Sequence, residues 1–201
     1  MSSRDDILAR VRRSQPKPRP LPAVPPFDAG RSNAFETFAA NLARMGGRVV
    51  AVPEQGDLDA LVRGLFPDAR VICSAAREVA GNRPLSTIAT PTDLHDVDVA
   101  VVRALFGVAE TGSVWLSETQ LRVNSLAFLA QHLVVLLDPQ ALVTTLHQAY
   151  QHPGFASARY AVLMTGPSAT ADIEGVLIHG AQGVRTMSVI AVASECGPRP
   201  A

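Results

Sequence analysis

Cysteine and lysine are almost missing from this sequence. Its 201 residues include two cysteines, Cys73 and Cys196, which form no Cys-x-x-Cys spacing. The chain therefore offers no recognisable iron–sulfur or zinc motif, and nothing in it indicates a disulfide framework. Of the 18 basic residues only Lys17 is a lysine, and it lies among prolines. This placement argues against a Schiff-base lysine and against a pyridoxal phosphate enzyme.

An excess of charge of either sign is also missing, as is any long hydrophobic run. Eighteen basic and 18 acidic residues give a formal net charge of zero, which leaves no global electrostatic argument for binding nucleic acid or an anionic membrane. The first 13 residues are polar and charged, and no apolar run approaches the roughly 20 residues of a membrane-spanning helix. We therefore expect a reduced, cytoplasmic protein with no membrane span and no nucleic-acid partner.

Composition and prolines divide the chain into four parts. Hydrophobic residues make up 47% and charged residues 18%, which is typical of a globular protein, and the length favours one domain. Ser3 and Asp6 suggest the start of an N-terminal helix, whereas six prolines between positions 16 and 26 exclude a helix there and indicate an extended tether. The predicted parts are a helix over 1–14, a proline-rich linker over 15–31, one α/β domain over 32–194 and a tail over 195–201.

Apolar runs alternate with amphipathic stretches inside the predicted domain. Ser32 is the expected cap of its first helix, and Gly46-Gly47 the expected end. The pattern predicts helices over 32–45, 57–66, 139–150 and 170–178, and strands over 48–52, 69–73, 87–90, 97–102, 113–116, 131–137, 161–164 and 186–192. This alternation predicts an α/β fold with a mostly parallel sheet and helices on both faces.

Two glycine-bounded turns follow apolar runs and carry the functional argument. The first spans 107–113, and the second begins at Gly166-Pro167-Ser168, directly after the strand over 161–164. A strand that opens through such a turn into a helix leaves backbone N–H groups at the carboxyl edge of the sheet, where open α/β sheets bind ligands. Helix capping by Ser168 or Thr170, with Asp172 and Glu174 at the positive end of the helix dipole, explains the same residues without chemistry.

Glu110 is the strongest candidate for chemistry. It stands between two apolar runs, so we expect it at a strand end, partly enclosed, where a carboxylate has a raised pKa or a fixed partner and can act as a general base or nucleophile. A surface-loop glutamate fits the sequence equally well. Arg122 is a candidate clamp for a carboxylate, or a lone surface arginine. Asp172 and His179 lie seven residues apart on the predicted helix but have no clear third ligand, so no metal site is predicted.

Four segments together resemble the LUD domain family, and within it the lactate utilization protein C branch, the short member without iron–sulfur motifs. They are AETGS at 109–113, Arg122, TGPSATADIE at 165–174 and the turn from Gly180 to Gly183. The resemblance implies a fold similar to the ribose-5-phosphate isomerase, glucosamine-6-phosphate deaminase and CoA transferase group. In that group strand-end loops bind phosphosugars or acyl-CoA, and a carboxylate does the chemistry.

Carried onto this chain, the resemblance makes Glu110 the catalytic residue and 166–172 an anion cradle. The predicted ligand-binding residues are Thr111, Gly112, Ser113, Arg122, Gly166, Pro167, Ser168, Thr170, Asp172, Gly180 and Gly183. Three features depart from the family's pattern: Gln182 stands where the family has a histidine, Ala169 where it often has a basic residue, and Leu129-Ala130 where a Leu-Pro step is common. Gln182 cannot act as an acid–base group near neutral pH.

The resemblance implies a component of a multi-subunit system that oxidises L-lactate to pyruvate. With no cysteine cluster and no flavin or nicotinamide fingerprint, the chain would carry no cofactor, and partner subunits would hold the iron–sulfur clusters. It would bind partners, or a small carboxylate or other anionic ligand, through the strand-end loops. One alternative is a stand-alone phosphosugar- or acyl-CoA-handling enzyme that uses Glu110. Another is an assembly scaffold that uses the N-terminal helix and the linker.

Overall fold

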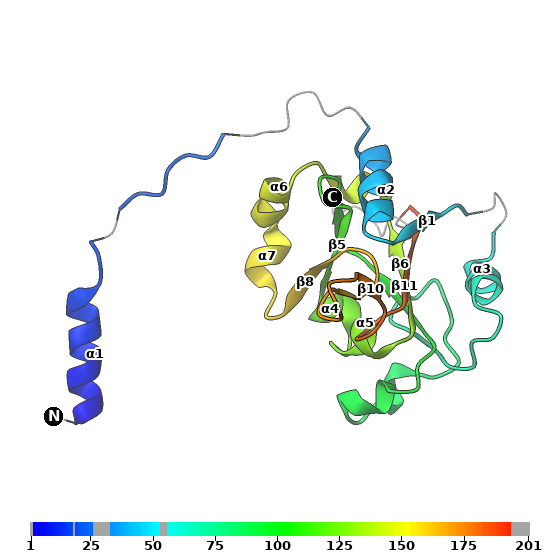
Figure 1. Cartoon of the computed structure of the whole chain (residues 1–201), viewed down its shortest axis with the longest axis horizontal. Coiled ribbons are helices and arrows are strands. Elements are labelled where there is room, and N and C mark those ends of the chain that lie inside the picture. Colours follow the sequence, from blue (N-terminus) through cyan, green and yellow to red (C-terminus); the bar gives the residue numbers. More distant parts are fainter. Residues whose placement is uncertain (1, 18, 26–32, 53–55, 194–201) are drawn as a thin grey trace, which may run out of the picture.

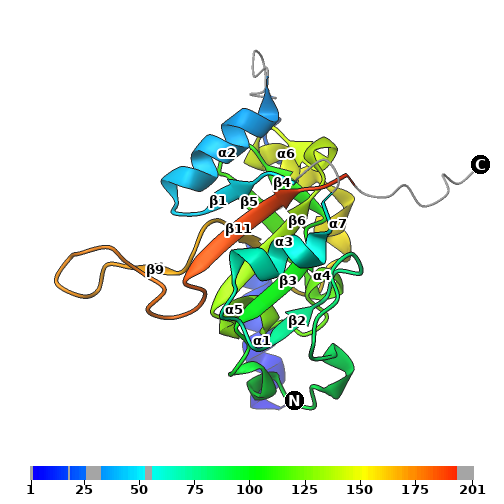
Figure 2. The same cartoon turned by 90° about the vertical axis from the view of Figure 1, so that its right-hand side faces the viewer.

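A five-stranded parallel sheet forms the centre of the protein. The computed structural model describes residues 2–17, 19–25, 33–52 and 56–193. Every neighbouring pair in this sheet is parallel, and the order across it is β1 (Arg48–Val50), β11 (Thr186–Ala191), β6 (His132–Leu137), β3 (Val99–Arg103) and β2 (Ile72–Ser74) (Figure 2). The prediction of an α/β fold with a mostly parallel central sheet is confirmed.

A second sheet packs beside the first. Its order is β7 (Leu142–Val143), β4 (Phe106–Val108), β5 (Ser113–Ser117) and β8 (Ala161–Met164), and the β4–β5 and β5–β8 pairs are antiparallel. The strand predicted over 161–164 is therefore present but belongs to this sheet. Its carboxyl end does not contribute to the carboxyl edge of the parallel sheet, where a ligand site was expected.

Alternate residues of β3 face two different cores. Ala100 and Val102 pack with helices α2 (Ala34–Arg44), α4 (Glu118–Leu121) and α5 (Leu126–Leu129) and with the second sheet. Val99 and Val101 pack with α3 (Leu58–Leu65), which crosses the front of the sheet in Figure 2. Helices do cover both faces, and the second sheet shares one of them. This double burial is why the strands of the parallel sheet are almost continuously apolar.

Short helices cover the outer face of the second sheet. Helices α6 (Leu146–Gln151) and α7 (Pro153–Ser157) pack around Phe106 and Trp115, whose ring centroids are 5.4 Å apart. The helix predicted over 139–150 is wrong in its first half, because a 3-10 turn (Pro139–Ala141) and β7 occupy it. The Thr145 side chain accepts a hydrogen bond from the Gln148 N–H, and this cap starts α6 after the strand.

The remaining predicted elements differ in their ends or in their type. Helix α1 (Ser3–Ser14) is capped by Ser2 with Asp5 rather than by Ser3, and it buries none of its residues (Figure 1). Helix α2 begins after Asn33, whose side chain caps it by accepting a hydrogen bond from the Glu36 N–H, and the expected cap Ser32 lies outside the described residues. Gly46-Gly47 ends α2 as predicted, with Gly46 at a φ of +82°. The strand predicted over 87–90 is wrong, because two 3-10 turns (Leu85–Thr87 and Pro91–Leu94) flank this stretch.

Parts of the predicted organisation lie outside the described residues. These are 26–31 of the linker, Cys196 and the tail over 195–201. Within the part of the chain that the structure describes, no helix has both the length and the apolar character needed to cross a membrane.

Candidate functional site

The turn at Gly166-Pro167-Ser168 leads into a hairpin, not a helix. Strand β9 (Ala169–Thr170) pairs antiparallel with β10 (Ile178–His179). The helix predicted over 170–178 is therefore wrong, and so is the expected helix N-terminus with Asp172 and Glu174 in its first turn. Glu174 and Gly175 have φ values of +54° and +71°, and these two successive left-handed residues reverse the chain where a continuous helix was expected.

Internal hydrogen bonds satisfy the polar groups of Ser168. Its hydroxyl donates to the Gln182 carbonyl at 2.5 Å, its N–H donates to the Val184 carbonyl at 3.0 Å, and its carbonyl accepts from the Gly180 N–H at 2.7 Å. Gly183, at a φ of +123°, lies so close that a Cβ built on it would be 3.1 Å from the Ser168 Cβ. The structure thus brings Ser168, Gly180 and Gly183 together. Their contacts hold the turn at Ser168 against the turn over 180–183.

Two motif glycines let their turns approach helix α2. Gly112 has a φ of +66°, and a Cβ built on it would lie 2.3 Å from the backbone nitrogen of Leu42. Gly166 has a φ of +67°, and its Cβ would lie 2.1 Å from the carbonyl oxygen of Met45. A side chain fits at neither position without moving the helix, so both glycines are required by packing.

A row of hydroxyls joins the two predicted turns. The Oγ1 of Thr111 lies 2.7 Å from the Oγ of Ser113, which lies 2.5 Å from the Oγ1 of Thr165. Ser113 is buried. The side chains of the first turn therefore contact the start of the second turn, and these hydroxyls are hydrogen-bonded to one another.

A cleft of about 660 Å³ opens beside the second turn. Its walls are the residues 127–129, 164–169 and 182–184, which include the predicted Gly166, Pro167, Ser168 and Gly183. None of the residues that line it is charged, and Phe128 and Leu129 are 36% and 38% exposed. This cleft suits an apolar group or a protein partner better than a small anion.

Glu110 lies outside this cleft. Its Oε2 accepts a hydrogen bond from the Leu146 N–H at 2.8 Å, in the first turn of α6, and its carbonyl accepts from the Asn41 side chain at 2.9 Å. The side chain is at a strand end and has a fixed partner, as expected, but it is exposed rather than partly enclosed. Its geometry is that of a side chain that caps α6, and its catalytic role stays a prediction.

Arg122 also lies apart from the second turn. It lines a different cleft of about 320 Å³, together with Ala75, Ala76, Arg77, Glu78, Arg103, Ala104, Leu105, Thr119 and Gln120. Its backbone has a φ of +61° and a ψ of −49°, and the Val123 N–H donates to the Leu121 carbonyl at 2.6 Å. This is a γ-turn of the rare, strained kind centred on Arg122.

Arg103 and Glu78 are charged residues of this second cleft that sequence reasoning missed. The Nε of Arg103 lies 2.6 Å from the Oε1 of Glu78, and the side chains are 21% and 13% exposed. Arg103 Nη1 also donates to the Val192 carbonyl at 3.3 Å. The available signal was a charged residue at the end of an apolar strand, which points to the edge of a sheet. Glu78 could not be paired with it, because 25 residues separate them.

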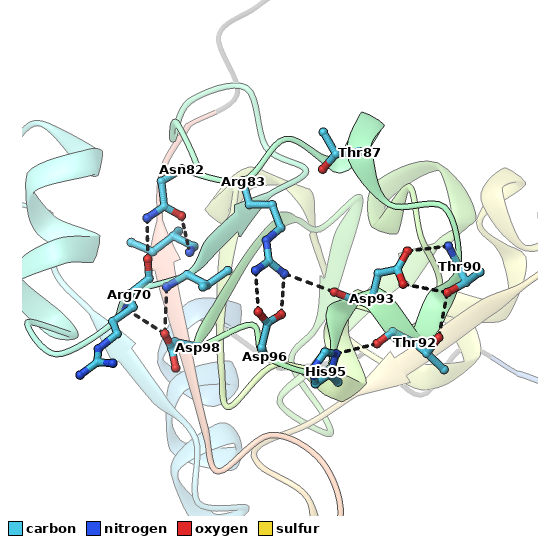
Figure 3. Close-up of polar contacts among 12 residues, drawn as sticks. Arg70, Asn82, Arg83, Thr87, Thr90, Thr92, Asp93, His95, Asp96 and Asp98 are labelled. Atoms are coloured by element: carbon cyan, nitrogen blue, oxygen red, sulfur yellow. Dashed lines mark hydrogen bonds and ion pairs between the residues drawn. The ribbon is translucent and has the colours of Figure 1, made fainter.

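Another polar cluster holds the connection between β2 and β3 (Figure 3). Arg83 Nη1 and Nη2 lie 2.5 and 2.6 Å from the two carboxylate oxygens of Asp96, and this fork holds the pKa of Asp96 at about 2. Asp98 accepts hydrogen bonds from the N–H groups of Arg70 and Val71 at 2.8 and 2.9 Å. These contacts hold the loops of the β2–β3 connection together.

His132 lies at the opposite, amino edge of the parallel sheet. Its ring stacks on Phe66 with centroids 4.6 Å apart, and its Nδ1 lies 2.8 Å from the Thr186 Oγ1. Burial lowers the pKa of His132, and the nearby positive charge of Arg185 lowers it further. Both effects favour the neutral form of the ring, which packs between β6 and β11.

Comparisons with known proteins agree with the fold. The chain is 22% identical to the uncharacterized protein NMB1437 of Neisseria meningitidis serogroup B, over an alignment 227 positions long that covers 96% of this chain and 94% of that protein. The crystal structure of a DUF162 family protein from Deinococcus radiodurans superposes with a TM-score of 0.60 at 15% identity, covering 80% of this chain and 96% of the other. The model of the LUD domain matches residues 87–192, more than half of the sequence. The chain therefore belongs to the LUD domain family.

Proposed function

We propose that this protein is a non-iron–sulfur subunit of a multi-component system that oxidises L-lactate to pyruvate, of the lactate utilization protein C type. Membership of the LUD domain family carries the proposal, because that family is associated with lactate utilization. Iron–sulfur clusters are usually held by four cysteine thiolates, and this sequence has two cysteines. The clusters, and the transfer of electrons to them, therefore fall to partner subunits.

The β9–β10 hairpin is the surface that best suits such a partner. It projects from the body of the protein in Figure 2, and Ile173, Val176 and Leu177 at its tip are 52%, 59% and 60% exposed. Three large apolar side chains within five residues are an unusual exposure for a monomer and are typical of a protein contact. The strands of the hairpin lead directly into the largely apolar cleft beside Ser168. Tip and cleft together would form one contact surface for an iron–sulfur subunit.

Affinity purification of the tagged full-length chain from cells grown on L-lactate tests both parts of the proposal. The double variant Ile173→Asp with Leu177→Asp places charges on the hairpin tip without touching the core. Tyr150→Asp is the matched control, because Tyr150 is 61% exposed but lies on α6. We expect the wild type and the control to retain iron–sulfur proteins and lactate-dependent reduction of an electron acceptor, and the double variant to lose both.

Two results would count against the proposal. A wild-type chain that purifies alone from lactate-grown cells would refute the subunit role. A double variant that keeps its partners, while its circular dichroism matches the wild type, would show that the contact lies elsewhere on the surface.

A further inference from the structure

Helix α1 presents an apolar face that no described part of the protein covers. Ile7 and Val11, one turn apart, are 58% and 52% exposed, and Leu8 widens the stripe that they form. The helix buries none of its residues and stands apart from the rest of the protein in Figure 1. A helix of 12 residues is marginal in water on its own, because most helical stability comes from packing an apolar face. We therefore expect α1 to be stable only where this face is docked.

Arginines surround the apolar stripe of α1. At helical spacing Arg4 lies within the stripe, and Arg10 and Arg12 border it on its two sides. All three are exposed, and among the described residues none of them forms an ion pair. Asp6 lies on the opposite side of the helix, and Asp5 is hydrogen-bonded in the cap at its N-terminus. The face that is available for docking is therefore apolar and positively charged.

The tip of the β9–β10 hairpin complements this face. Its exposed residues include two carboxylates, Asp172 and Glu174, among three large apolar side chains, Ile173, Val176 and Leu177. In the part of the chain that the structure describes, neither carboxylate forms an ion pair. An apolar surface with negative charge fits a partner surface that is apolar and positively charged, because opposite charges steer and orient the contact. The hairpin tip and α1 thus match in both polarity and charge.

Exposed apolar side chains gather on the N-terminal arm (α1 and the linker), on the hairpin tip and in the cleft beside it. Of the large ones in the described residues, only Met45, Leu105 and Tyr150 lie elsewhere. Contact between the arm and the hairpin would remove both groups from water at once, which is the hydrophobic gain that each lacks alone.

The linker favours docking on a second copy of the chain over docking on the same one. Six prolines lie between positions 16 and 26, and a proline-rich segment is extended and semi-rigid. The 11 positions from 16 to 26, at about 3.1 Å each, span about 34 Å. A domain of this size has a radius of gyration of about 15 Å. The spacer therefore holds α1 away from its own domain and within reach of a neighbouring one.

We propose that α1 binds the hairpin tip of a second copy of this chain, so that two copies exchange their N-terminal helices in a symmetric dimer. The apolar stripe packs on Ile173, Val176 and Leu177, and the arginines beside it pair with Asp172 and Glu174. Both contacts form in one dimer, so the second is intramolecular and strengthens the first. The hairpin tip is also the surface proposed above for an iron–sulfur subunit, which would have to displace α1.

Analytical ultracentrifugation of the purified full-length chain tests the exchange with two charge-reversal variants. Arg4→Glu with Arg12→Glu reverses the charge of the α1 face, and Asp172→Arg with Glu174→Arg reverses that of the hairpin tip. We expect the wild type to be a dimer that dissociates on dilution. Each variant alone should raise the dissociation constant about tenfold or more, because attraction becomes repulsion. Only the purified chain is needed, so the outcome is separate from any search for iron–sulfur partners.

An equimolar mixture of the two variants distinguishes exchange from docking within one chain. In a mixed dimer the reversed α1 of one variant meets the reversed tip of the other, and the second contact is the wild-type one. The mixture should therefore dimerise about as tightly as the wild type. The matched control, Arg13→Glu with Arg63→Glu, makes the same change in charge on the opposite side of α1 and on α3, and should dimerise like the wild type.

Four results would overturn the inference. These are a wild-type chain that stays monomeric, a mixture of the two variants that forms no dimer, a chain without residues 1–14 that dimerises as tightly as the wild type, and equal weakening by the control variant. Cosedimentation with vesicles of phosphatidylcholine and phosphatidylglycerol is the parallel measurement, because a basic amphipathic helix also suits an anionic membrane surface. A monomeric wild type whose vesicle binding is lost in the Arg4→Glu, Arg12→Glu variant would assign α1 to a membrane instead.

Discussion

Replacing Gly166 with alanine tests whether the motif glycines serve packing. A Cβ built on Gly166, where φ is +67°, would lie 2.1 Å from the Met45 carbonyl oxygen at the end of α2. Gly175 at the hairpin tip is a matched control, because its φ is +71° and no other described atom lies within 4 Å of its Cβ position. The two substitutions share a backbone conformation and differ in the space that the new methyl group meets.

The expected magnitude follows from that difference. Both variants place an L-residue in the left-handed region at a cost of about 1–2 kcal/mol, and both recover roughly 0.4–1 kcal/mol because alanine stiffens the unfolded chain. The conformational cost and the unfolded-chain gain are the same in both variants, so they cancel when the two variants are compared. Gly166→Ala must in addition displace the end of α2, and forcing extra atoms into packed structure costs about 1–3 kcal/mol. At about 2–4 °C per kcal/mol for a chain of this size, Gly166→Ala should melt roughly 2–12 °C below Gly175→Ala.

Thermal denaturation followed by the fluorescence of Trp115 measures this difference in melting temperature, and urea denaturation with the same probe measures the corresponding difference in unfolding free energy. Trp115 is the one tryptophan of the sequence and is 2% exposed, so its emission reports on the core of the second sheet. The slope of the unfolding free energy against urea should be the same for both variants, because they expose the same surface. Equal stability of the two proteins, or a more stable Gly166→Ala, would refute the close approach of the turn to α2.

Three other substitutions test separate parts of the structure. Glu110→Ala should lower the unfolding free energy by about 1 kcal/mol by removing the acceptor of the Leu146 N–H, whereas Glu110→Gln keeps an oxygen there; equal urea midpoints would contradict the cap. Leu133→Ala, fully buried in β6, should cost about 2–5 kcal/mol in the same assay, and a loss below 1 kcal/mol would contradict its place in the core. The pKa of His132 is lowered on folding, so the folded protein binds fewer protons than the unfolded chain. The contribution of His132 to stability is therefore complete above the unfolded pKa of about 6.5, and stability falls as the pH drops below that value. His132→Asn should flatten this fall in melting temperature, and an unchanged slope would contradict the assignment.

The parallel sheet could be predicted from the sequence because burial on both faces leaves an unmistakable pattern. Strand β6 is six apolar or half-buried residues in a row, and β3 is similar up to Arg103. Local pattern does not reveal which sheet a strand joins. The strand Ala161–Met164 was found, but its pairing with Val114 and Leu116 depends on contacts nearly 50 positions away along the chain, so its end was expected at the wrong edge.

The hairpin over 169–179 could not be predicted for a different reason. TADIE favours a helix start by composition, and β9 and β10 have two residues each, too few for a strand pattern. What forms them is tertiary, since Ser168 is bonded to Gln182 and Val184 and so holds both ends of the segment. Gly175 in the middle of the predicted helix was the available local signal, because glycine in a helix interior is unfavourable.

The positions that carry the family resemblance are mainly positions of close backbone approach. Gly112 and Gly166 lie against α2, and Gly183 lies against Ser168, which is itself hydrogen-bonded within the turn. Such glycines identify a fold reliably, because no other residue fits, but they say nothing about a ligand. If a variant of one of these glycines lost activity, the loss could come from misfolding as well as from lost chemistry. Arg122 is different, because its φ of +61° is unfavourable for a residue with a Cβ, so Arg122→Gly should raise stability while it removes the guanidinium, and a loss of activity in that variant would not come from misfolding. A variant of Arg122 therefore separates lost chemistry from lost folding, which no variant of these glycines can do.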